Sequence, residues 1–324
     1  MLPKFVSING SGMSGSGAIY DFLSSSNIFF DPFPQKEFSL SYDPGGLIDI
    51  ENRINNFSIN NSTEIYHKTK KLLSYYTSKE TGISFGKGLD DETKYFESAF
   101  LEFIDEVYNL SYSGFNQYFK FNTTKLNKLR INLTNKIDKI LKEKSYFSKL
   151  YVMSDITKFN ESVEKLMKKI FYDKNLENKD ILLNQGGTIF NPIKTTKYYN
   201  NCKNICVLRD PRDIFTEVKR KGYQFPGYDI QIFCKWYEAL MQRINPEDRK
   251  NENILFINFE EFVLNRDTSI NKILSHINVK NYDYKKSNFN FNRCENNCSI
   301  FKKELTNDEI KYLEKNLDRY TYDL

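Results

Sequence analysis

The sequence lacks three features that would assign it to well-defined classes of protein. No apolar run approaches the roughly 18 residues that cross a bilayer, so we expect no membrane span. Five cysteines are an odd number in a chain of 324 residues, which argues against a disulfide framework and favours a reducing compartment. The first apolar run begins by Lys4, so we expect no signal peptide or anchor before it. The sequence therefore predicts a cytoplasmic protein.

Signals for metals and nucleic acids are also weak. Cys294 and Cys298 are spaced like a metal pair, but no second pair and no nearby histidine accompanies them, so we expect free thiols and no metal. The net charge of +5 is a mild bias toward anionic ligands and is too small to indicate nucleic acid. Hydrophobic residues make up 40% of the chain, which is enough for a sizeable core in one large or two small domains.

A glycine-rich turn follows the first apolar run. Residues 5–8 predict a buried strand, residues 9–17 read NGSGMSGSG, and residues 18–23 have helical spacing. Strand, glycine-rich turn and helix are the context of a phosphate-binding loop, because glycines let backbone N–H groups approach an anion and the helix adds its dipole. Ser14 and Ser16 supply hydroxyl donors. A flexible turn with no ligand is the alternative for this stretch taken alone.

The same turn argues against a nucleotide hydrolase. Gly10 and Gly15 have the spacing of the loop in kinases and GTPases. That loop continues with Lys and then Ser or Thr, whereas Ser16 and Gly17 stand here. The sequence also offers no clear magnesium-binding acid. A kinase with a degenerate loop therefore stays an alternative.

Short apolar strands alternate with helices in the second half of the chain. This pattern predicts an α/β fold, with a central parallel sheet flanked by helices like that of P-loop nucleotide-binding proteins. Ligands of such sheets bind at the carboxyl ends of the strands, so residues after Ile8, Leu183 and Leu208 are expected around one crevice. The strands are expected at 181–185, 205–208 and 254–257, and the helices at 211–221, 229–243, 260–264 and 268–276.

The region from about 60 to 175 differs from the rest. Its apolar residues follow a helical period and no strand signal is of comparable strength, so we predict a large helical insertion into a single domain of residues 1–324. The expected helices are 64–79, 90–110, 124–144 and 158–171. Before this region, alternation over Glu37–Tyr42 predicts a half-buried strand or an extended edge. After it, Thr306 and Glu309 form a capping box for a last helix.

A second candidate anion motif follows the strand that ends at Leu208. Residues 209–213 read RDPRD, in which Asp210 suits a helix cap and Pro211 suits the first helical position. Arg209 is then expected at the carboxyl end of a strand, where a guanidinium grips a phosphate bidentately. The alternative is a structural turn in which Arg209 or Arg212 pairs with Asp213.

Together the two motifs resemble those of the sulfotransferases that use 3′-phosphoadenosine 5′-phosphosulfate (PAPS). The resemblance extends to residues 254–262 and 305–309 and is weak over the helical region. It implies that the glycine-rich loop holds the 5′-phosphosulfate, that Arg209–Asp213 holds the 3′-phosphate, and that 3′-phosphoadenosine 5′-phosphate (PAP) is the product. The cofactor-binding residues that it implies are Gly12, Met13, Ser14, Gly15, Ser16, Gly17, Arg209, Thr216, Glu217, Ser299 and Lys302.

Two positions depart from the family pattern. Met13 stands where the family usually has a cation, which leaves that charge to a substitute such as Lys36. Glu217 stands where the family usually has a serine, and Thr216 beside it is the candidate replacement. These departures support a second alternative, a non-catalytic binding protein that kept the fold.

The stretch with Lys36 and Glu37 resembles the Lys-Glu strand of carbohydrate sulfotransferases. The resemblance implies that Glu37 is the general base and that the acceptor is a hydroxyl of a saccharide. The plainer interpretation of Glu37 is an edge-strand carboxylate. His67 is the second candidate base, although its lysine-rich surroundings favour a solvated helix face.

Overall fold

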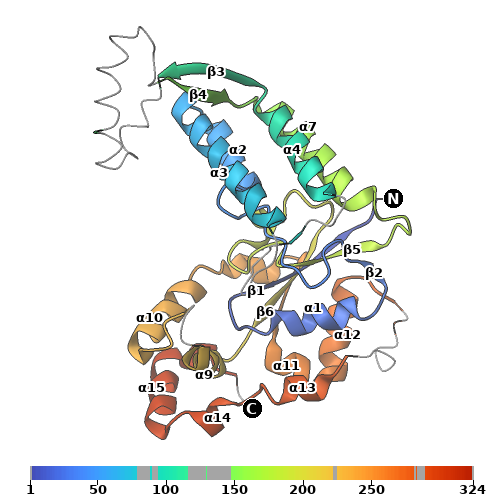
Figure 1. The fold of residues 1–324 in the computed structure, drawn as a ribbon. Coiled ribbons are helices and arrows are strands. Elements are labelled where there is room, and N and C mark those ends of the chain that lie inside the picture. Colours follow the sequence, from blue (N-terminus) through green and yellow to red (C-terminus); the bar gives the residue numbers. More distant parts are fainter. Residues whose placement is uncertain are drawn as a thin grey trace. The chain divides into compact units, whose positions relative to one another are not determined.

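The computed structural model describes residues 2–78, 88–89, 94–115, 129, 147–221, 225–280, 282 and 289–322 (Figure 1). Contacts between residues divide the chain into two compact units. The first, here called the sheet unit, comprises Met1–Ser41 and Phe171–Leu324. The second, here called the helical unit, comprises Tyr42–Ile170. The organisation of the whole chain as a single domain with an insertion stays a prediction.

The sheet unit is built on five parallel strands, as the alternation of strands and helices predicts. Their order is β2, β5, β1, β6, β7, so the first long strand of the chain is the central one. Ile8 of β1 pairs with Asn184 on one side and Ile205 on the other. The strands are β1 (Phe5–Gly10), β2 (Phe29–Phe30), β5 (Asp180–Asn184), β6 (Lys203–Leu208) and β7 (Ile254–Asn258).

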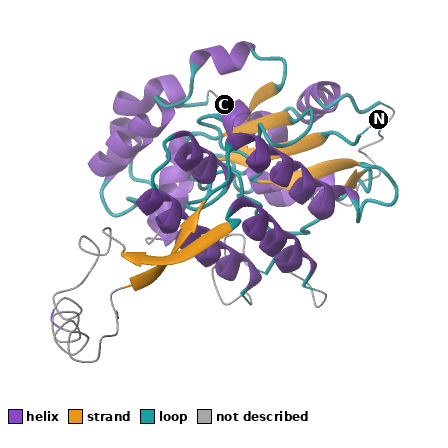
Figure 2. Cartoon of the chain, turned by 90° about the horizontal axis from the view of Figure 1, so that it is seen from above, coloured by secondary structure: helices purple, strands orange, loops and turns teal. Residues whose placement is uncertain are grey.

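Helices flank both faces of this sheet (Figure 2). Along β6, Ile205 and Val207 belong to one hydrophobic cluster and Cys206 to another, because successive side chains of a strand point to opposite faces. The first cluster includes residues of α1 (Ser16–Ser24), α11 (Phe259–Leu264), α12 (Arg266–His276) and α13 (Phe291–Glu295). The second includes residues of α9 (Pro211–Lys221), α10 (Ile230–Met241), α14 (Phe301–Glu304) and α15 (Asn307–Leu317).

The helix boundaries follow the expected caps. Thr306 and Glu309 form the capping box of α15. Asp210 Oδ1 accepts a hydrogen bond from the Arg212 N–H (2.8 Å), which places the predicted cap at the start of α9. The remaining short elements of the unit are α8 (Pro192–Thr195), η2 (Pro246–Lys250) and η4 (Asp318–Tyr320). None of the helices in the described ranges is both long enough and apolar enough to cross a membrane.

The helical unit contains helices close to those expected. It also contains a hairpin that was not expected. Its helices are α2 (Leu47–Asn55), α3 (Ile59–Thr77), α4 (Tyr95–Val107) and α7 (Ile156–Met167), and η1 (Lys168–Tyr172) continues α7. Strands β3 (Leu110–Phe115) and β4 (Phe147–Val152) pair antiparallel, so the expectation of helices alone in this region is wrong. Tertiary contacts favour β4, since Ser62 Oγ of α3 donates to the Tyr151 carbonyl (2.6 Å). The helix expected at 124–144 lies, apart from Leu129, outside the described residues.

Of the two alternatives predicted for Glu37–Tyr42, the strand is wrong. Phe38 and Leu40 are buried as the alternation requires, but the segment forms no ladder. Its hydrogen bonds go to the end of β5 and just beyond it, because the Phe38 N–H donates to the Asn184 carbonyl (2.8 Å) and Ser41 Oγ to the Gly186 carbonyl (3.2 Å). The segment therefore passes the carboxyl end of β5.

Candidate functional site: the glycine-rich loop and the arginine motif

The glycine-rich loop connects the central strand to α1. Gly15 caps the helix in the left-handed conformation with a φ of 80°, and a Cβ there would overlap the ring of Phe259. Only glycine meets both conditions without strain. Met13 also has a positive φ of 64°, and the Ser14 N–H closes a turn on the Ser11 carbonyl (3.0 Å). The local sequence thus forms a tight turn directly before α1.

Two hydroxyl groups converge inside this turn. A Cβ on Gly10 would overlap the hydroxyls of both Ser14 and Ser16, so glycine at the end of β1 leaves them room. Ser16 Oγ accepts a hydrogen bond from Gln185 Nε2 (3.3 Å), and Gln185 Oε1 accepts one from the Gly10 N–H (3.0 Å). Ser14 is 1% exposed, and its Oγ has no hydrogen-bond partner among the described residues. An unpaired buried hydroxyl costs free energy that a bound anion would recover.

Arg209 joins the second motif to this loop. Its Nη1 donates to the Met13 carbonyl (2.9 Å) and its Nη2 to the Asn297 carbonyl (2.6 Å). The guanidinium carbon lies 5.1 Å from the centre of the Phe259 ring, and the residue is 5% exposed. Arg209 Nε has no partner among the described residues. Since a guanidinium carries five N–H donors and two are used, donors remain for an anion.

Asp213 attaches the segment before α14 to the motif. Its Oδ2 accepts from the Ser299 N–H (2.8 Å) and its Oδ1 from the Phe301 N–H (3.1 Å). Burial raises the pKa of Asp213. Ser299 therefore lies beside the motif. Lys302 is exposed, with its Nζ 5.8 Å from the centre of the Phe301 ring.

Arg212 has a structural environment. Within the described residues its ion pairs go to Asp210 (2.6 Å) and to Glu314 (2.7 Å), rather than to Asp213 as in the alternative drawn from the sequence. Asp210 is 1% exposed and also accepts a hydrogen bond from the Tyr322 N–H (3.0 Å). Arg212 thus links the start of α9 to α15 and to the end of the described chain.

Glu260 is a buried acid that the sequence did not mark as part of the site. It is 0% exposed, and its Oε1 accepts a hydrogen bond from the Asp210 N–H (3.0 Å). Its Oε2 has no partner among the described residues. Burial raises the pKa of Glu260 to about 7, while the Arg209 charge opposes this shift. The signal was its position directly after a buried strand, where ligand-binding residues gather in parallel sheets.

Thr216 and Glu217 are not presented as phosphate ligands. Thr216 Oγ1 donates to the Arg212 carbonyl within α9 (2.8 Å), and the residue is 1% exposed. The Glu217 carboxylate lies 3.8 Å from Arg220 and 3.9 Å from Lys221. Neither side chain offers a free donor to an anion in this arrangement.

Lys36 and Glu37 lie in the segment that passes the carboxyl end of β5. Tyr20 of α1 fixes the start of this segment, because its hydroxyl donates to the Asp31 carboxylate and accepts from the Gln35 N–H (2.9 Å). Both Lys36 and Glu37 are half-buried. Since β5 is the neighbour of β1, Glu37 lies at the same edge of the sheet as the glycine-rich loop.

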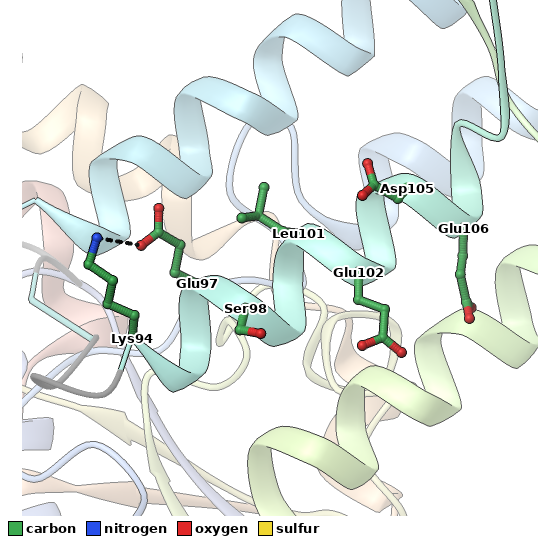
Figure 3. Close-up of a pocket in the computed structure, with 7 residues that line it drawn as sticks. All are labelled: Lys94, Glu97, Ser98, Leu101, Glu102, Asp105 and Glu106. Atoms are coloured by element: carbon green, nitrogen blue, oxygen red, sulfur yellow. Dashed lines mark ion pairs between the residues drawn. The ribbon is translucent and has the colours of Figure 1, made fainter.

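Two further candidates belong to the helical unit. His67 lies on α3, and burial together with the Lys71 charge lowers its pKa. A pocket of about 700 Å³ runs along α4 (Figure 3). It is lined by Lys94, Glu97, Ser98, Leu101, Glu102, Asp105 and Glu106. Four of these seven side chains are acidic, so the pocket disfavours an anionic nucleotide.

Metal ligands do not gather in the part of the chain that the structure describes. No group of three or more His, Cys, Asp or Glu side chains there is arranged to hold a metal ion. The five cysteines are present as free thiols. The polar groups described above at the loop and the motif include hydroxyls, backbone N–H groups and a guanidinium, which are donors to anions.

Comparisons with known proteins give structural likenesses at low identity. No protein-family model matches the sequence, and no curated protein is significantly similar to it. The sulfotransferase domain of the Synechococcus PCC 7002 olefin synthase has a TM-score of 0.42 at 12% identity, over 100% of this chain and 96% of that one. Sulfotransferase STF9 of Mycobacterium avium has a TM-score of 0.38 at 11% identity, over 98% and 75%. Mouse sulfotransferase SULT7A1 complexed with PAP has a TM-score of 0.28 at 19% identity, over 48% and 54%. With TM-scores below 0.5, these likenesses do not identify the family of the chain.

Proposed function

We propose that this chain is a sulfotransferase that takes its sulfuryl group from PAPS. The observation that carries the proposal is the hydrogen bond from Arg209 Nη1 to the Met13 carbonyl (2.9 Å). It brings the two anion motifs of the sequence into contact. A ligand with anionic groups at two positions, as in a nucleotide with a 3′-phosphate and a 5′-phosphosulfate, matches such a pair.

The residues present fit this nucleotide. The unpaired Ser14 hydroxyl and the N-terminus of α1 are donors for the 5′-phosphosulfate. The Nε of Arg209, which has no partner among the described residues, is a donor for the 3′-phosphate. Ser299 lies beside the same motif, because its N–H donates to the Asp213 carboxylate. Thr216 and Glu217 contribute no donor as they stand, so the 3′-phosphate depends on Arg209.

In the proposed reaction the protein removes a proton and stabilises charge. When bound, PAPS supplies the sulfuryl group. The acceptor oxygen forms a bond to sulfur while the bond from sulfur to the 5′-phosphate oxygen breaks, and PAP leaves with the electron pair. Glu37 takes the proton of the acceptor hydroxyl. The loop and Ser14 stabilise charge on the sulfuryl and phosphate oxygens. A saccharide acceptor and a cytoplasmic location are parts of the proposal that depend on the sequence alone.

The proposal is tested by binding and by turnover. Titration calorimetry compares PAP with ATP plus magnesium, and mass spectrometry follows PAPS-dependent sulfation of saccharide and non-saccharide hydroxyl acceptors. We expect PAP to bind, ATP to bind weakly, and Glu37→Gln to reduce turnover by about a hundredfold or more while PAP still binds. Tight binding of ATP in place of PAP would support the kinase with a degenerate loop. PAP binding with turnover that Glu37→Gln leaves unchanged would remove Glu37 from the mechanism.

A further inference from the structure

The last turn of α9 contacts the glycine-rich loop. Lys221 Nζ lies 3.6 Å from Met13 Sδ. Met13 packs against the hydrophobic cluster that contains Phe215 and Val218 of α9, so this contact belongs to a larger interface between loop and helix. A lysine ammonium therefore lies beside the loop, although it comes from a distant part of the sequence.

The three basic residues of this turn differ in how fully they are paired. Lys219 pairs with Glu309 at 2.6 Å, and Arg220 forms a close pair with Glu304. Among the described residues, the carboxylate that pairs with Lys221 is that of Glu217, at 3.9 Å, and Arg220 shares it at 3.8 Å. Lys221 is thus the least neutralised of the three and is the one that contacts the loop. Its side chain is 47% exposed, so an anion from solvent reaches it.

The loop itself carries no charged side chain. Residues 9–17 provide backbone N–H groups and the hydroxyls of Ser14 and Ser16. Arg209 already donates to the carbonyls of Met13 and Asn297. A doubly charged anion on this loop needs a compensating cation, and partial charges of a helix terminus supply only part of it.

We propose that Lys221 is the anion-binding cation of the glycine-rich loop and reaches the ligand across the Met13 side chain. The Lys221 ammonium lies 3.6 Å from the Met13 sulfur, and its side chain is 47% exposed, so the charge lies between the loop and solvent. The identity of the anion as the 5′-phosphosulfate rests on the proposed function. The role of Lys221 in binding an anion does not rest on the proposed function, because this role follows from the contact between Lys221 and the loop.

The test uses two probes and a matched pair of variants. Titration calorimetry measures PAP and inorganic pyrophosphate binding to the wild type, Lys221→Gln and Lys219→Gln. Both lysines belong to one helical turn, but Lys219 faces Glu309 instead of the loop. We expect Lys221→Gln to bind both probes about tenfold more weakly and Lys219→Gln to stay within about twofold of the wild type.

A charge relocation separates a binding role from a structural one. In the double variant Met13→Lys with Lys221→Gln the contact between ammonium and thioether is removed, while the ammonium moves onto the loop itself. Lys221→Gln lowers the affinity, and we expect the double variant to recover at least half of that change in log Kd. We expect Lys221→Arg to bind nearly as tightly as the wild type. A purely structural role of Lys221 would leave the relocated variant as weak as Lys221→Gln.

The outcomes distinguish this inference from the proposed function. Lys221-dependent binding of pyrophosphate without binding of PAP would support the role of Lys221 and overturn the proposed function. PAP binding that is equal in the wild type and Lys221→Gln, or equally weakened in both lysine variants, would overturn the role of Lys221 alone. Absence of binding of both probes to the wild type would overturn both.

Discussion

The glycine-rich loop and the arginine motif resemble each other as sequence signals but differ in how far their polar groups are satisfied. The loop keeps a buried Ser14 hydroxyl without a partner among the described residues. In the motif, both carboxyl oxygens of Asp213 accept backbone N–H groups, and Asp210 pairs with Arg212. The loop thus keeps a polar group that is not satisfied by the described residues, whereas most polar groups of the motif are used to hold elements of the protein together.

Arg209 is the exception within its motif. It contacts the loop through Met13, and its Nε has no partner among the described residues, so it combines a structural role with an available donor. An RDPRD sequence therefore does not make every charged residue in it a ligand-binding residue. Substitutions at neighbouring positions are expected to separate stability from binding.

The largest effect on stability is expected from Arg212→Ala. The side chain of Asp210 is 0% exposed, so removal of the Arg212 guanidinium leaves a buried carboxylate that keeps two backbone N–H donors but loses its ion-pair partner. We expect a loss of about 3 to 5 kcal/mol in the free energy of unfolding, with the binding of PAP to the folded fraction retained. Arg319→Ala breaks the exposed pair with Glu238 and is expected to cost less than about 1 kcal/mol. Urea unfolding measures both, and equal losses would contradict a structural role of Arg212.

Glu260→Gln is expected to change how stability depends on pH. Because the folded pKa of about 7 lies above the unfolded value near 4.5, the contribution of Glu260 is fully present below pH 4.5 and is lost as the pH rises through 7. Glutamine stays neutral, so relative to the wild type the variant gains about 2 kcal/mol between pH 5.5 and pH 8.5. Urea unfolding at both pH values checks this, and an identical pH dependence of the two proteins would contradict it.

Gly15→Ala and Gly17→Ala test the shape of the loop. Alanine at Gly15 meets both a positive φ and the ring of Phe259, so we expect a loss of about 2 kcal/mol. A Cβ at Gly17 meets no heavy atom within 4 Å, and this position is helical, so alanine there should add about 0.5 to 1 kcal/mol. Thermal unfolding compares the pair. A destabilised Gly17→Ala with an unaffected Gly15→Ala would contradict the loop conformation.

The smallest effect on stability is expected from Ser14→Ala, and this variant separates stability from binding most clearly. Ser14→Ala removes a buried hydroxyl that has no partner in the described structure, so the free energy of unfolding should stay unchanged or rise by about 1 kcal/mol. The affinity for PAP should fall in the same variant. Ser16→Ala serves as the control, because it removes the acceptor of Gln185 and should lower stability. Loss of stability in Ser14→Ala would mean that its hydroxyl has a partner within the protein.

Much of the fold could be predicted from the sequence because it depends on local patterns. Four of the five parallel strands, the glycine-rich turn and the capping box of α15 follow from apolar runs, glycine and cap residues. The hairpin of β3 and β4 could not be predicted, because contacts with Ser62 from a distant helix favour β4. The segment at Glu37 alternates like a strand, yet it forms none. Instead, the Phe38 N–H donates to the Asn184 carbonyl at the end of β5.

The site was partly predictable for the same reason. The loop and Arg209 follow from residues that are adjacent in sequence, and the structure brings them together. The contacts of Glu260 with Asp210 and of Lys221 with Met13 join residues far apart in the chain, and no spacing in the sequence indicates them. The Thr216 hydroxyl is not available to a phosphate, because it donates to the Arg212 carbonyl of its own helix.

The central claim is that the loop and Arg209 form one site for a nucleotide with phosphates at its 3′ and 5′ positions. It is tested most directly by thermal unfolding of the full chain with PAP and with adenosine 5′-phosphate, which lacks the 3′-phosphate. At about 100 times its Kd, PAP should add about 2.7 kcal/mol and raise the melting temperature by a few degrees. Adenosine 5′-phosphate at the same concentration should raise it much less. Equal shifts with both ligands, or no shift with PAP, would contradict the claim.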